Sequence, residues 1–270
     1  MTQSGGGIVQ LDKVKAAEIL VSEHRTGLRF RPLGEAFGLR GAEDAYDVQD
    51  EYVRLQMQAR SVGAAGYKIG LTTKRMQEMC GIDSPIAGAV LQDRIHKSGA
   101  SVRTSAYGRL GLEFEIAVRM ARGLPDRAGV PGLADVAAAV DAVAPAIELI
   151  DDRGADYGRL DALSLIADNS WNAGIVLGEF ARPWPELAAI EGVVTLDGGI
   201  IDRGFGSAVL GHPFNAVAWL AGHLGRTGKE LRSGDIVMTG NTVTTKFPDR
   251  PSVYRFELTG LGSVDLSVAS

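Results

Sequence analysis

Short apolar runs separated by turn residues fill most of this chain, and they constrain its fold more than any other feature. From about residue 66 onward, Gly, Pro or Asp residues separate each run from the next, a pattern typical of strands joined by turns. The sequence Asp197-Gly198-Gly199 lies between two runs and predicts a β-hairpin. The runs that we interpret as strands are GYKIGLT, GAVLQDRI, GLEFEIAVRM, PAIELID, AGIVLG, GVVTL, GDIVMTG, VYRFEL and LGSVDLSV.

Helical spacing of apolar residues marks other segments. Such residues recur at roughly helical intervals from Val9 to Leu20, and a second amphipathic pattern covers residues 43–60. Two more helices are predicted within the β-rich part, over residues 132–143 and 213–224.

The helical and β-type patterns do not alternate regularly, which favours an α+β fold over a βαβ repeat. We expect a helical N-terminal region over residues 1–62 and a β-rich catalytic domain over residues 63–270. A chain of 270 residues is long enough to bury one large core with such an appendage.

Composition excludes several classes of protein. A hydrophobic fraction of 45% and a charged fraction of 23% are typical of a soluble globular protein. A net charge of −5 gives no electrostatic attraction to nucleic acid or to an anionic membrane. Cys80 is the only cysteine, so an intrachain disulfide and a cysteine-based zinc site are excluded. With no signal-peptide pattern and no long apolar stretch, we expect a cytoplasmic protein.

GLEFEIAVRM is the most informative of the predicted strands. Side chains alternate between the two faces of a strand, so Glu113 and Glu115 share one face, about 7 Å apart. The other face carries Leu112, Phe114 and Ile116. Two carboxylates side by side repel each other unless a positive charge lies between them. The pair therefore indicates either a solvated strand face or a cation site.

A third glutamate favours the cation site. Glu148 lies in APAIELI, where its apolar neighbours make a charge costly unless it is paired or bound to a cation. One lysine cannot balance three carboxylates, so a metal ion is the better neutraliser. Oxygen ligands favour Mg²⁺ or Mn²⁺, and the sequence has no Cys or His cluster typical of zinc.

Other polar residues allow both a structural and a functional interpretation. Lys68, in Gly-Tyr-Lys-Ile-Gly, fits an edge strand or a lysine whose pKa burial and a nearby cation would lower. Asp83, before Ser-Pro, fits a turn as well as a functional residue. His212, before Pro213, is interpreted as a structural residue at a helix start. Asp168, in IADNSWNAG, fits a turn or a pocket wall.

The order and spacing of these segments resemble the 2-keto-4-pentenoate hydratase and 4-oxalocrotonate decarboxylase group of the fumarylacetoacetate hydrolase superfamily. The resemblance covers nearly all of residues 45–270. It rests on the segments AYDVQDEYV, GYKIGLT, GIDSPIAG, GLEFEIAVRM, APAIELIDDR, IADNSWNAG, VLGHPFNAVAWLA and SGDIVMTGN.

This resemblance implies a folded-over β-sheet core in the domain over 63–270, preceded by a helical N-terminal region. It also implies a homo-oligomer and a requirement for Mg²⁺ or Mn²⁺. By position, it assigns the metal to Glu113, Glu115 and Glu148, proton transfer to Lys68 and Asp83, and the substrate pocket to Leu71, Asn169 and Asn241.

The implied reaction adds water to a 2-hydroxy-2,4-dienoate, such as 2-hydroxypenta-2,4-dienoate, to give a 4-hydroxy-2-oxo acid in aromatic-compound catabolism. Decarboxylation of a 4-oxalocrotonate-type diacid needs the same stabilised intermediate and is the alternative. Hydrolysis of an acylpyruvate ranks third because it needs a His–Glu pair, and neither His24 nor His96 lies in a suitable setting. A non-catalytic scaffolding role ranks below these, since every expected position is retained.

The sequence departs from the commoner pattern of this group in two places. Asn241 stands where relatives often carry serine, and the loop over 242–250 is not the usual proline-rich form. In this loop Lys246 or Arg250 would be able to receive the distal carboxylate of a diacid, although a solvated loop is the favoured interpretation of both residues.

Overall fold

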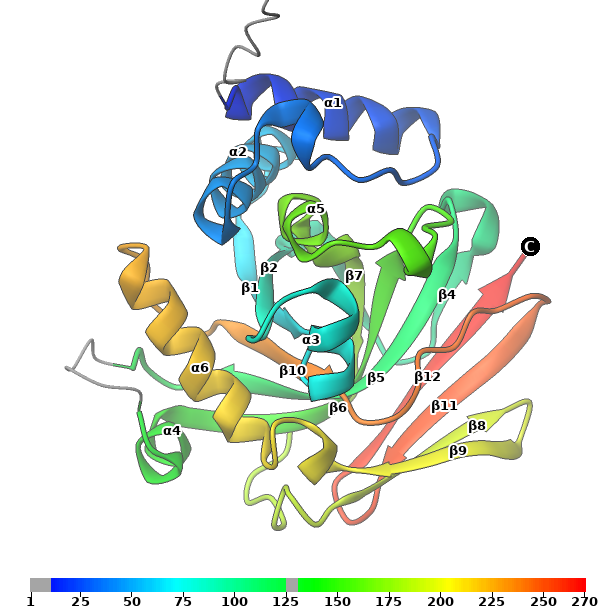
Figure 1. Cartoon of the computed structure of the whole chain (residues 1–270). Helices are drawn as coiled ribbons and strands as arrows, with labels where there is room; N and C mark the ends of the chain where they lie inside the picture. Colours follow the sequence, from blue (N-terminus) through cyan, green and yellow to red (C-terminus); the bar gives the residue numbers. More distant parts are fainter. Residues whose placement is uncertain (1–10, 125–130) are drawn as a thin grey trace, which may run out of the picture.

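Two β-sheets form the centre of the molecule (Figure 1). The structure is a computed structural model, and it describes residues 11–124 and 131–270. The strands are β1 (Ala64–Gly70), β2 (Ile86–Leu91), β3 (Ile95–Lys97), β4 (Ala100–Arg103), β5 (Leu110–Met120), β6 (Val140–Asp151), β7 (Asn172–Leu177), β8 (Glu191–Leu196), β9 (Gly199–Phe205), β10 (Ile236–Asn241), β11 (Ser252–Leu258) and β12 (Gly262–Ala269). The larger sheet has the order β2-β1-β10-β5-β6-β7-β3, and the smaller has the order β4-β12-β11-β8-β9.

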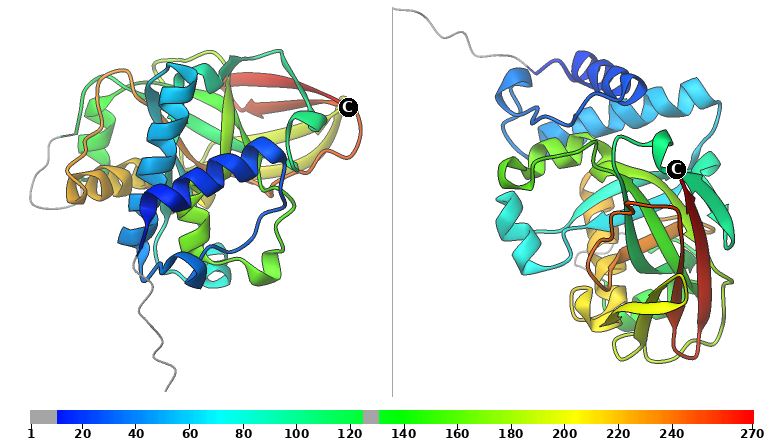
Figure 2. Two further views of the ribbon diagram at one scale, coloured as in Figure 1. Left: turned by 90° about the horizontal axis from the view of Figure 1, so that it is seen from above. Right: turned by 90° about the vertical axis from the view of Figure 1, so that its right-hand side faces the viewer.

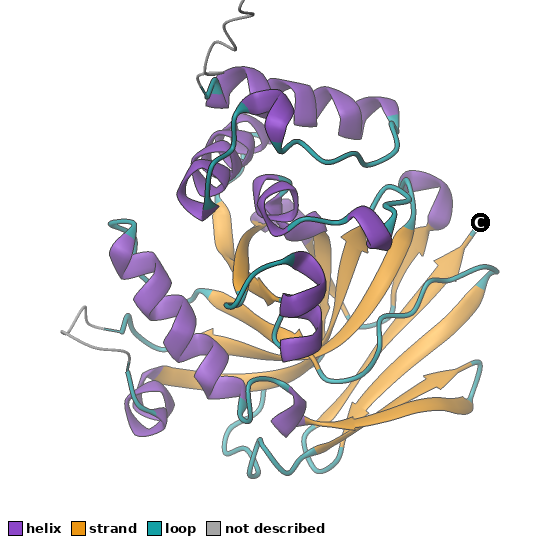
Figure 3. Cartoon of the chain, viewed as in Figure 1, coloured by secondary structure: helices purple, strands orange, loops and turns teal. Residues whose placement is uncertain are grey.

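The alternation predicted for GLEFEIAVRM determines how the two sheets meet. The apolar face of β5, with Leu112, Phe114 and Ile116, joins a core that also includes Phe256 of β11 and Leu266 of β12. All five of these side chains are fully buried. Figure 3 shows the two sheets as ribbons. Because side chains alternate along a strand, the opposite face of β5, which carries the glutamates, is turned away from this shared core.

Two N-terminal helices lie together on one side of the molecule (Figure 2). Helix α1 (Lys13–Thr26) begins after Asp12, whose side chain accepts a hydrogen bond from the backbone of Lys15. Helix α2 (Ala42–Arg60) matches the amphipathic pattern over 43–60. Both pack with α5 (Ala162–Ala167) around a second apolar cluster. The α+β prediction is thus confirmed; the boundary at residue 62 stays a prediction, and Val9 lies outside the described residues.

One predicted helix is much shorter than expected. The pattern over 132–143 forms only α4 (Leu133–Ala139), and Val140 already belongs to β6. In β6, Val140 pairs with Met120 and Val143 with Val118. Pairing along the whole length of β5 therefore prevails over the helical spacing of an alanine-rich segment.

Two further helices complete the described part of the fold. They are α3 (Lys74–Cys80) and α6 (Pro213–Arg226), with short 3₁₀ turns η1 (Glu35–Phe37), η2 (Gln92–Arg94), η3 (Thr104–Ala106), η4 (Tyr157–Arg159), η5 (Asn169–Trp171) and η6 (Gly206–Ala208). His212 caps α6 through a hydrogen bond from the Phe214 backbone to its Nδ1, which confirms its structural interpretation. The predicted hairpin joins β8 to β9, with Asp197 and Gly198 at positive φ. No described helix is long and apolar enough to cross a membrane.

Candidate active site

Three glutamates from two neighbouring strands converge on one point. Glu113 of β5 lies directly opposite Glu148 of β6 in the antiparallel register, and Glu115 lies two residues further along the same face of β5. Each glutamate offers a carboxylate oxygen within 4.8 Å of those of the other two. Glu115 and Glu148 are fully buried. Like charges directly opposite on a sheet are destabilising, so this register needs a compensating positive charge.

Lys68 of β1 supplies part of that charge. Its ammonium nitrogen lies 3.3 Å from Glu148 Oε1, and only 3% of the residue is exposed. The three carboxylates and one ammonium still leave two negative charges without a partner in the cluster. A divalent cation has the charge that balances them.

The oxygen atoms of the cluster fit such a cation. Glu115 Oε1 and Glu148 Oε2 are buried and have no hydrogen-bond partner. Buried acceptors without a partner are rare and costly, and both lie among the carboxylates that converge here. An all-carboxylate donor set suits a hard ion such as Mg²⁺ or Mn²⁺. The residues present therefore fit a divalent metal site.

The pKa values of the cluster reflect this crowding of carboxylates. Burial, reinforced by the neighbouring glutamates, raises the pKa of Glu115 well above its usual range. Burial also raises the pKa of Glu148 to about 7, although Lys68 acts against it. For Lys68 itself, burial acts to lower the pKa, but the three glutamates outweigh it and leave the pKa raised. The expected lowering of the Lys68 pKa is thus absent from the cluster as it stands without a cation.

Hydrogen bonds from other elements orient each glutamate. Asn172 Nδ2 of β7 donates to Glu148 Oε1 at 2.8 Å, and Thr245 Oγ1 donates to Glu113 Oε1 at 2.9 Å. The backbone N–H of Gly240 donates to Glu115 Oε2 at 2.8 Å. Sequence reasoning missed all three donors. IADNSWNAG drew attention to the segment that holds Asn172, but no spacing rule distinguishes Asn172 from its neighbours.

Gly240 shows why only glycine suits its position. Its φ is +122°, a conformation that residues with side chains rarely adopt. A Cβ atom there would also lie 2.6 Å from the Thr72 side chain. In this conformation the Gly240 N–H donates its hydrogen bond to Glu115.

A cavity of about 420 Å³ adjoins the cluster. Lys68 and Glu113 contribute to its wall, as do the predicted pocket residues Leu71 and Asn241. Asn241 Oδ1 also accepts a hydrogen bond from the Phe114 backbone. The other lining residues are Ile69, Gly70, Thr72, Thr73, Arg75, Met76, Met79, Ile86, Ile150, Tyr157, Leu160, Leu165, Ser170, Trp171, Val243, Thr244, Thr245 and Phe247.

Four other residues singled out from the sequence lie outside this wall. Asp83 is exposed in the turn between α3 and β2. Asn169 is buried beside the cavity, where its side chain exchanges two hydrogen bonds with the Ala89 backbone, at 2.7 and 2.9 Å. Lys246 is paired with Asp202 at 2.5 Å, and Arg250 with Asp197 at 2.8 Å. Neither of these two cations reaches the cavity wall.

One wall of the cavity is built from unusual backbone. Asn169, Ser170 and Trp171 are three consecutive non-glycine residues with φ between 49° and 60°. Leu71, on the facing wall, has a φ of 55°. Such conformations cost of order 1–3 kcal/mol each and persist only where the surroundings hold them. Ser170, Trp171 and Leu71 all line the cavity.

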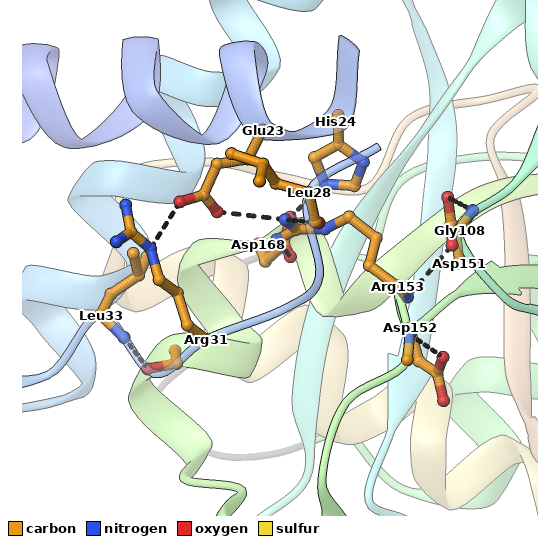
Figure 4. Close-up of polar contacts among 12 residues, drawn as sticks. Glu23, His24, Leu28, Arg31, Leu33, Gly108, Asp151, Asp152, Arg153 and Asp168 are labelled. Atoms are coloured by element: carbon orange, nitrogen blue, oxygen red, sulfur yellow. Dashed lines mark hydrogen bonds and ion pairs between the residues drawn. The ribbon is translucent and has the colours of Figure 1, made fainter. Parts of the chain in front are cut away.

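A buried ionic network lies immediately behind this wall (Figure 4). Arg153, 2% exposed, donates from Nη2 to Asp168 Oδ2 at 2.7 Å and from Nη1 to Glu23 Oε2 at 3.1 Å. His24 Nε2 lies 2.5 Å from Asp168 Oδ1. Burial acts to raise the pKa of Asp168, but His24 and Arg153 together outweigh it and leave the pKa below its usual value. The network, which we call the Arg153 network (Glu23, His24, Arg153 and Asp168), joins α1 to the segment that precedes the wall.

The position of His24 also bears on hydrolysis as a possible activity. His24 belongs to the Arg153 network, and His96 lies in β3 at the edge of the large sheet. Neither residue lines the cavity. Within the described residues, therefore, no histidine–glutamate pair stands at the cavity wall beside the three glutamates.

Comparison with known proteins agrees with this geometry. The chain is 35% identical over 232 residues to 2-oxo-hept-4-ene-1,7-dioate hydratase of Escherichia coli, covering 82% of this chain and 85% of the relative. It is 30% identical to 2-keto-4-pentenoate hydratase of Paraburkholderia xenovorans, covering 93% and 92%. The 4-oxalocrotonate decarboxylase of Pseudomonas putida G7, solved with magnesium and adipate, superimposes with a TM-score of 0.88 at 29% identity, covering 95% and 97%.

A family model matches most of the chain. The model of the fumarylacetoacetate (FAA) hydrolase C-terminal domain matches residues 70–269. That segment includes β5, β6, β7 and β10, which carry the three glutamates and two of their hydrogen-bond donors. The chain belongs to the fumarylacetoacetate hydrolase family.

Proposed function

We propose that this protein is a divalent-metal-dependent hydratase that adds water to a 2-hydroxy-2,4-dienoate and forms a 4-hydroxy-2-oxo acid. The observation that carries the proposal is the buried cluster of three glutamates and Lys68 beside an apolar cavity. The names of the relatives support it, since they include 2-keto-4-pentenoate hydratase and 2-hydroxyhexa-2,4-dienoate hydratase.

Glu113, Glu115 and Glu148 would hold Mg²⁺ or Mn²⁺. The bound cation would supply Lewis-acid stabilisation of negative charge at the C2 oxygen of the substrate. Lys68 would hold and deliver the proton that moves during enol-to-keto conversion, because its ammonium is charged and adjoins the cavity. The apolar walls would exclude bulk water from the diene. Asp83 stays the predicted second proton-transfer group, and its exposed position requires the turn between α3 and β2 to approach the substrate.

The proposal is tested by ultraviolet absorbance. The Mg²⁺-loaded protein should bleach the absorbance of 2-hydroxypenta-2,4-dienoate or a homologue, because hydration removes the conjugated diene. A Glu113→Ala variant should lose both Mg²⁺ binding and turnover. The proposal fails if the loaded protein turns over no 2-hydroxydienoate, or if Glu113→Ala remains fully active.

Decarboxylation of a 4-oxalocrotonate-type diacid is the second candidate function. It is favoured by the similarity to the 4-oxalocrotonate decarboxylase structure that contains magnesium and adipate. The same metal-stabilised enolate would serve both reactions. Release of CO₂ from 4-oxalocrotonate, measured beside the absorbance assay, distinguishes the two.

A further inference from the structure

The walls of the active-site cavity differ sharply in chemistry from its metal end. Among the residues that line the cavity, only Lys68, Arg75 and Glu113 carry charge. Lys68 and Glu113 belong to the glutamate cluster, so Arg75 is the one lining cation outside it. The rest of the wall is dominated by aliphatic, thioether and aromatic side chains.

Arg75 is placed poorly for binding a buried carboxylate. It lies in the first turn of α3 with an exposed side chain, and it forms no hydrogen bond or salt bridge with the described part of the chain. An ion pair with an exposed, mobile arginine changes an affinity by at most about fivefold. The two cations of the 242–250 loop are occupied by Asp202 and Asp197.

Apolar side chains extend to the mouth of the cavity. Met79 and Phe247 line it, yet each is 39% exposed, which places them among the exposed large hydrophobic residues of the described chain. A ligand with an apolar end would cover them. A ligand that ends in a carboxylate would have to lose water of hydration beside them, and the lining outside the glutamate cluster offers it neutral hydroxyl groups but no buried cation.

The size of the cavity also favours a substrate with an additional apolar group. Even at the roughly 30 Å³ that a water molecule occupies in the liquid, the roughly eight non-hydrogen atoms of 2-hydroxypenta-2,4-dienoate would take up about 240 Å³. The cavity is about 420 Å³. The remaining space adjoins apolar walls and is large enough for a short alkyl chain or an aryl ring.

We propose that this enzyme selects monocarboxylic 2-hydroxydienoates that carry an apolar alkyl or aryl substituent at the far end of the diene, and discriminates against diacids of the same length. This inference rests on the proposed function for the head group of the substrate. It adds the chemistry of the tail, which the apolar wall and the exposed Met79 and Phe247 determine. It also separates this chain from its relative named for a 1,7-dioate.

The test uses saturated 2-oxo acids, so that binding is measured apart from turnover. Calorimetry with the Mg²⁺-loaded full chain compares 2-oxopentanoate, 2-oxooctanoate and 2-oxooctanedioate. Burying one methylene is worth about fourfold in affinity, so 2-oxooctanoate should bind at least 10-fold more tightly than 2-oxopentanoate. It should also bind at least 10-fold more tightly than the diacid of equal length. Equal or tighter binding of the diacid, or affinity independent of chain length, overturns the inference.

Two variants locate the source of the selectivity. Phe247→Ser should weaken binding of 2-oxooctanoate by a larger factor than binding of 2-oxopentanoate. In Arg75→Gln, the preference for 2-oxooctanoate over the diacid should persist. If instead the diacid binds tightly to the wild type and is lost in Arg75→Gln, Arg75 receives the distal carboxylate and the inference is wrong.

The experiments distinguish failure of the hydratase proposal from failure of the proposed preference for an apolar substrate tail. Selective binding of 2-oxooctanoate without turnover of any 2-hydroxydienoate supports the tail assignment and contradicts the hydratase assignment. Turnover of 2-hydroxydienoates with a preference for the diacid supports the hydratase assignment and contradicts the tail assignment. If none of the three 2-oxo acids binds to the loaded protein, the inference fails together with the head-group assignment on which it rests.

Discussion

At the scale of single residues, the hydrogen bonds around the glutamates decide how well the cluster holds a cation. Asn172 donates to Glu148 Oε1 and fixes the direction of a carboxylate whose other oxygen has no partner. Partners of this kind typically change metal affinity by about 10- to 100-fold. Under the proposed function, Asn172 would therefore influence metal binding without being one of the ligands.

We predict that Asn172→Ala weakens Mg²⁺ binding by about 10- to 100-fold, because Glu148 loses its orientation but keeps its charge. Calorimetric titration with Mg²⁺ measures this effect. A matched control is Asn215→Ala, which removes an asparagine side chain that bonds only the Leu210 carbonyl in an exposed part of α6. Equal Mg²⁺ affinities of the two variants would contradict the assignment.

Lys68 allows metal binding to be separated from proton transfer. Lys68→Met keeps most of the side-chain volume and removes the ammonium group beside Glu148. We expect the turnover number for a 2-hydroxydienoate to fall by about 10²- to 10⁴-fold, the usual contribution of general acid–base catalysis. Mg²⁺ affinity should hold or increase, since a competing positive charge is gone. A variant that loses Mg²⁺ binding would show that Lys68 is a structural part of the metal site.

At the scale of elements, the Arg153 network links α1 to the end of α5 and to the wall that follows it. Its members come from widely separated positions in the chain, and Glu23, Arg153 and Asp168 are almost completely buried. Removing one partner of a buried ion pair leaves an uncompensated charge. The network therefore stabilises the fold only while all of its members are present.

We predict that Arg153→Met lowers the free energy of unfolding by about 3–5 kcal/mol, because Glu23 and Asp168 remain buried without their partner. Denaturant unfolding measures the loss. Arg31→Ala is the control, since Arg31 also pairs with Glu23 but its side chain is 66% exposed. That change should cost no more than about 1 kcal/mol. Similar losses in the two variants would show that burial does not govern the strength of these pairs.

The same scale shows where sequence reasoning succeeds and where it fails. Period-two alternation correctly places Glu113 and Glu115 on one face, because alternation is a local property of the strand. It fails at residues 140–143, where pairing with β5 converts a helical pattern into strand. Local patterns also contain no trace of the bond from Thr245 to Glu113, which joins residues 132 positions apart. Nor do they reveal that Lys246 and Arg250 each form an ion pair with an aspartate.

At the scale of the whole molecule, the glutamate cluster is a source of instability that the rest of the fold must offset. The cluster lies on the central strands of the large sheet, with its glutamates on the neighbouring strands β5 and β6 and Lys68 on β1, which β10 separates from β5. Here buried carboxylates take the place of apolar side chains between β5 and β6, which pair along most of their length. A cation held by the three glutamates would convert this liability into a link between β5 and β6, so that metal content should influence the stability of the whole chain.

This coupling predicts a defined dependence on pH. The pKa of Glu148 is about 7 in the folded chain without a cation, above its ordinary value of 4.5. Below the ordinary value the carboxyl is protonated in both states and has no effect. As the pH rises toward about 7, the unfolded chain loses the proton first, and stability falls. Above that pH Glu148 is ionised in the folded chain, its repulsion by the neighbouring glutamates is expressed, and a metal ion no longer competes with a proton at Glu148.

We therefore expect saturating Mg²⁺ to raise the melting temperature more at pH 8 than at pH 5.5. Thermal melts of the metal-free and Mg²⁺-loaded chain at both pH values provide the measurement. The difference between loaded and metal-free protein cancels the titration of groups far from the cluster, including Asp168 of the Arg153 network. Glu148→Gln removes one titrating carboxyl of the cluster and should reduce the pH dependence of the Mg²⁺ effect, while Glu115, whose pKa is also raised, continues to contribute to it. An equal Mg²⁺-induced shift at both pH values in the wild type would mean that the cation does not bind at Glu148.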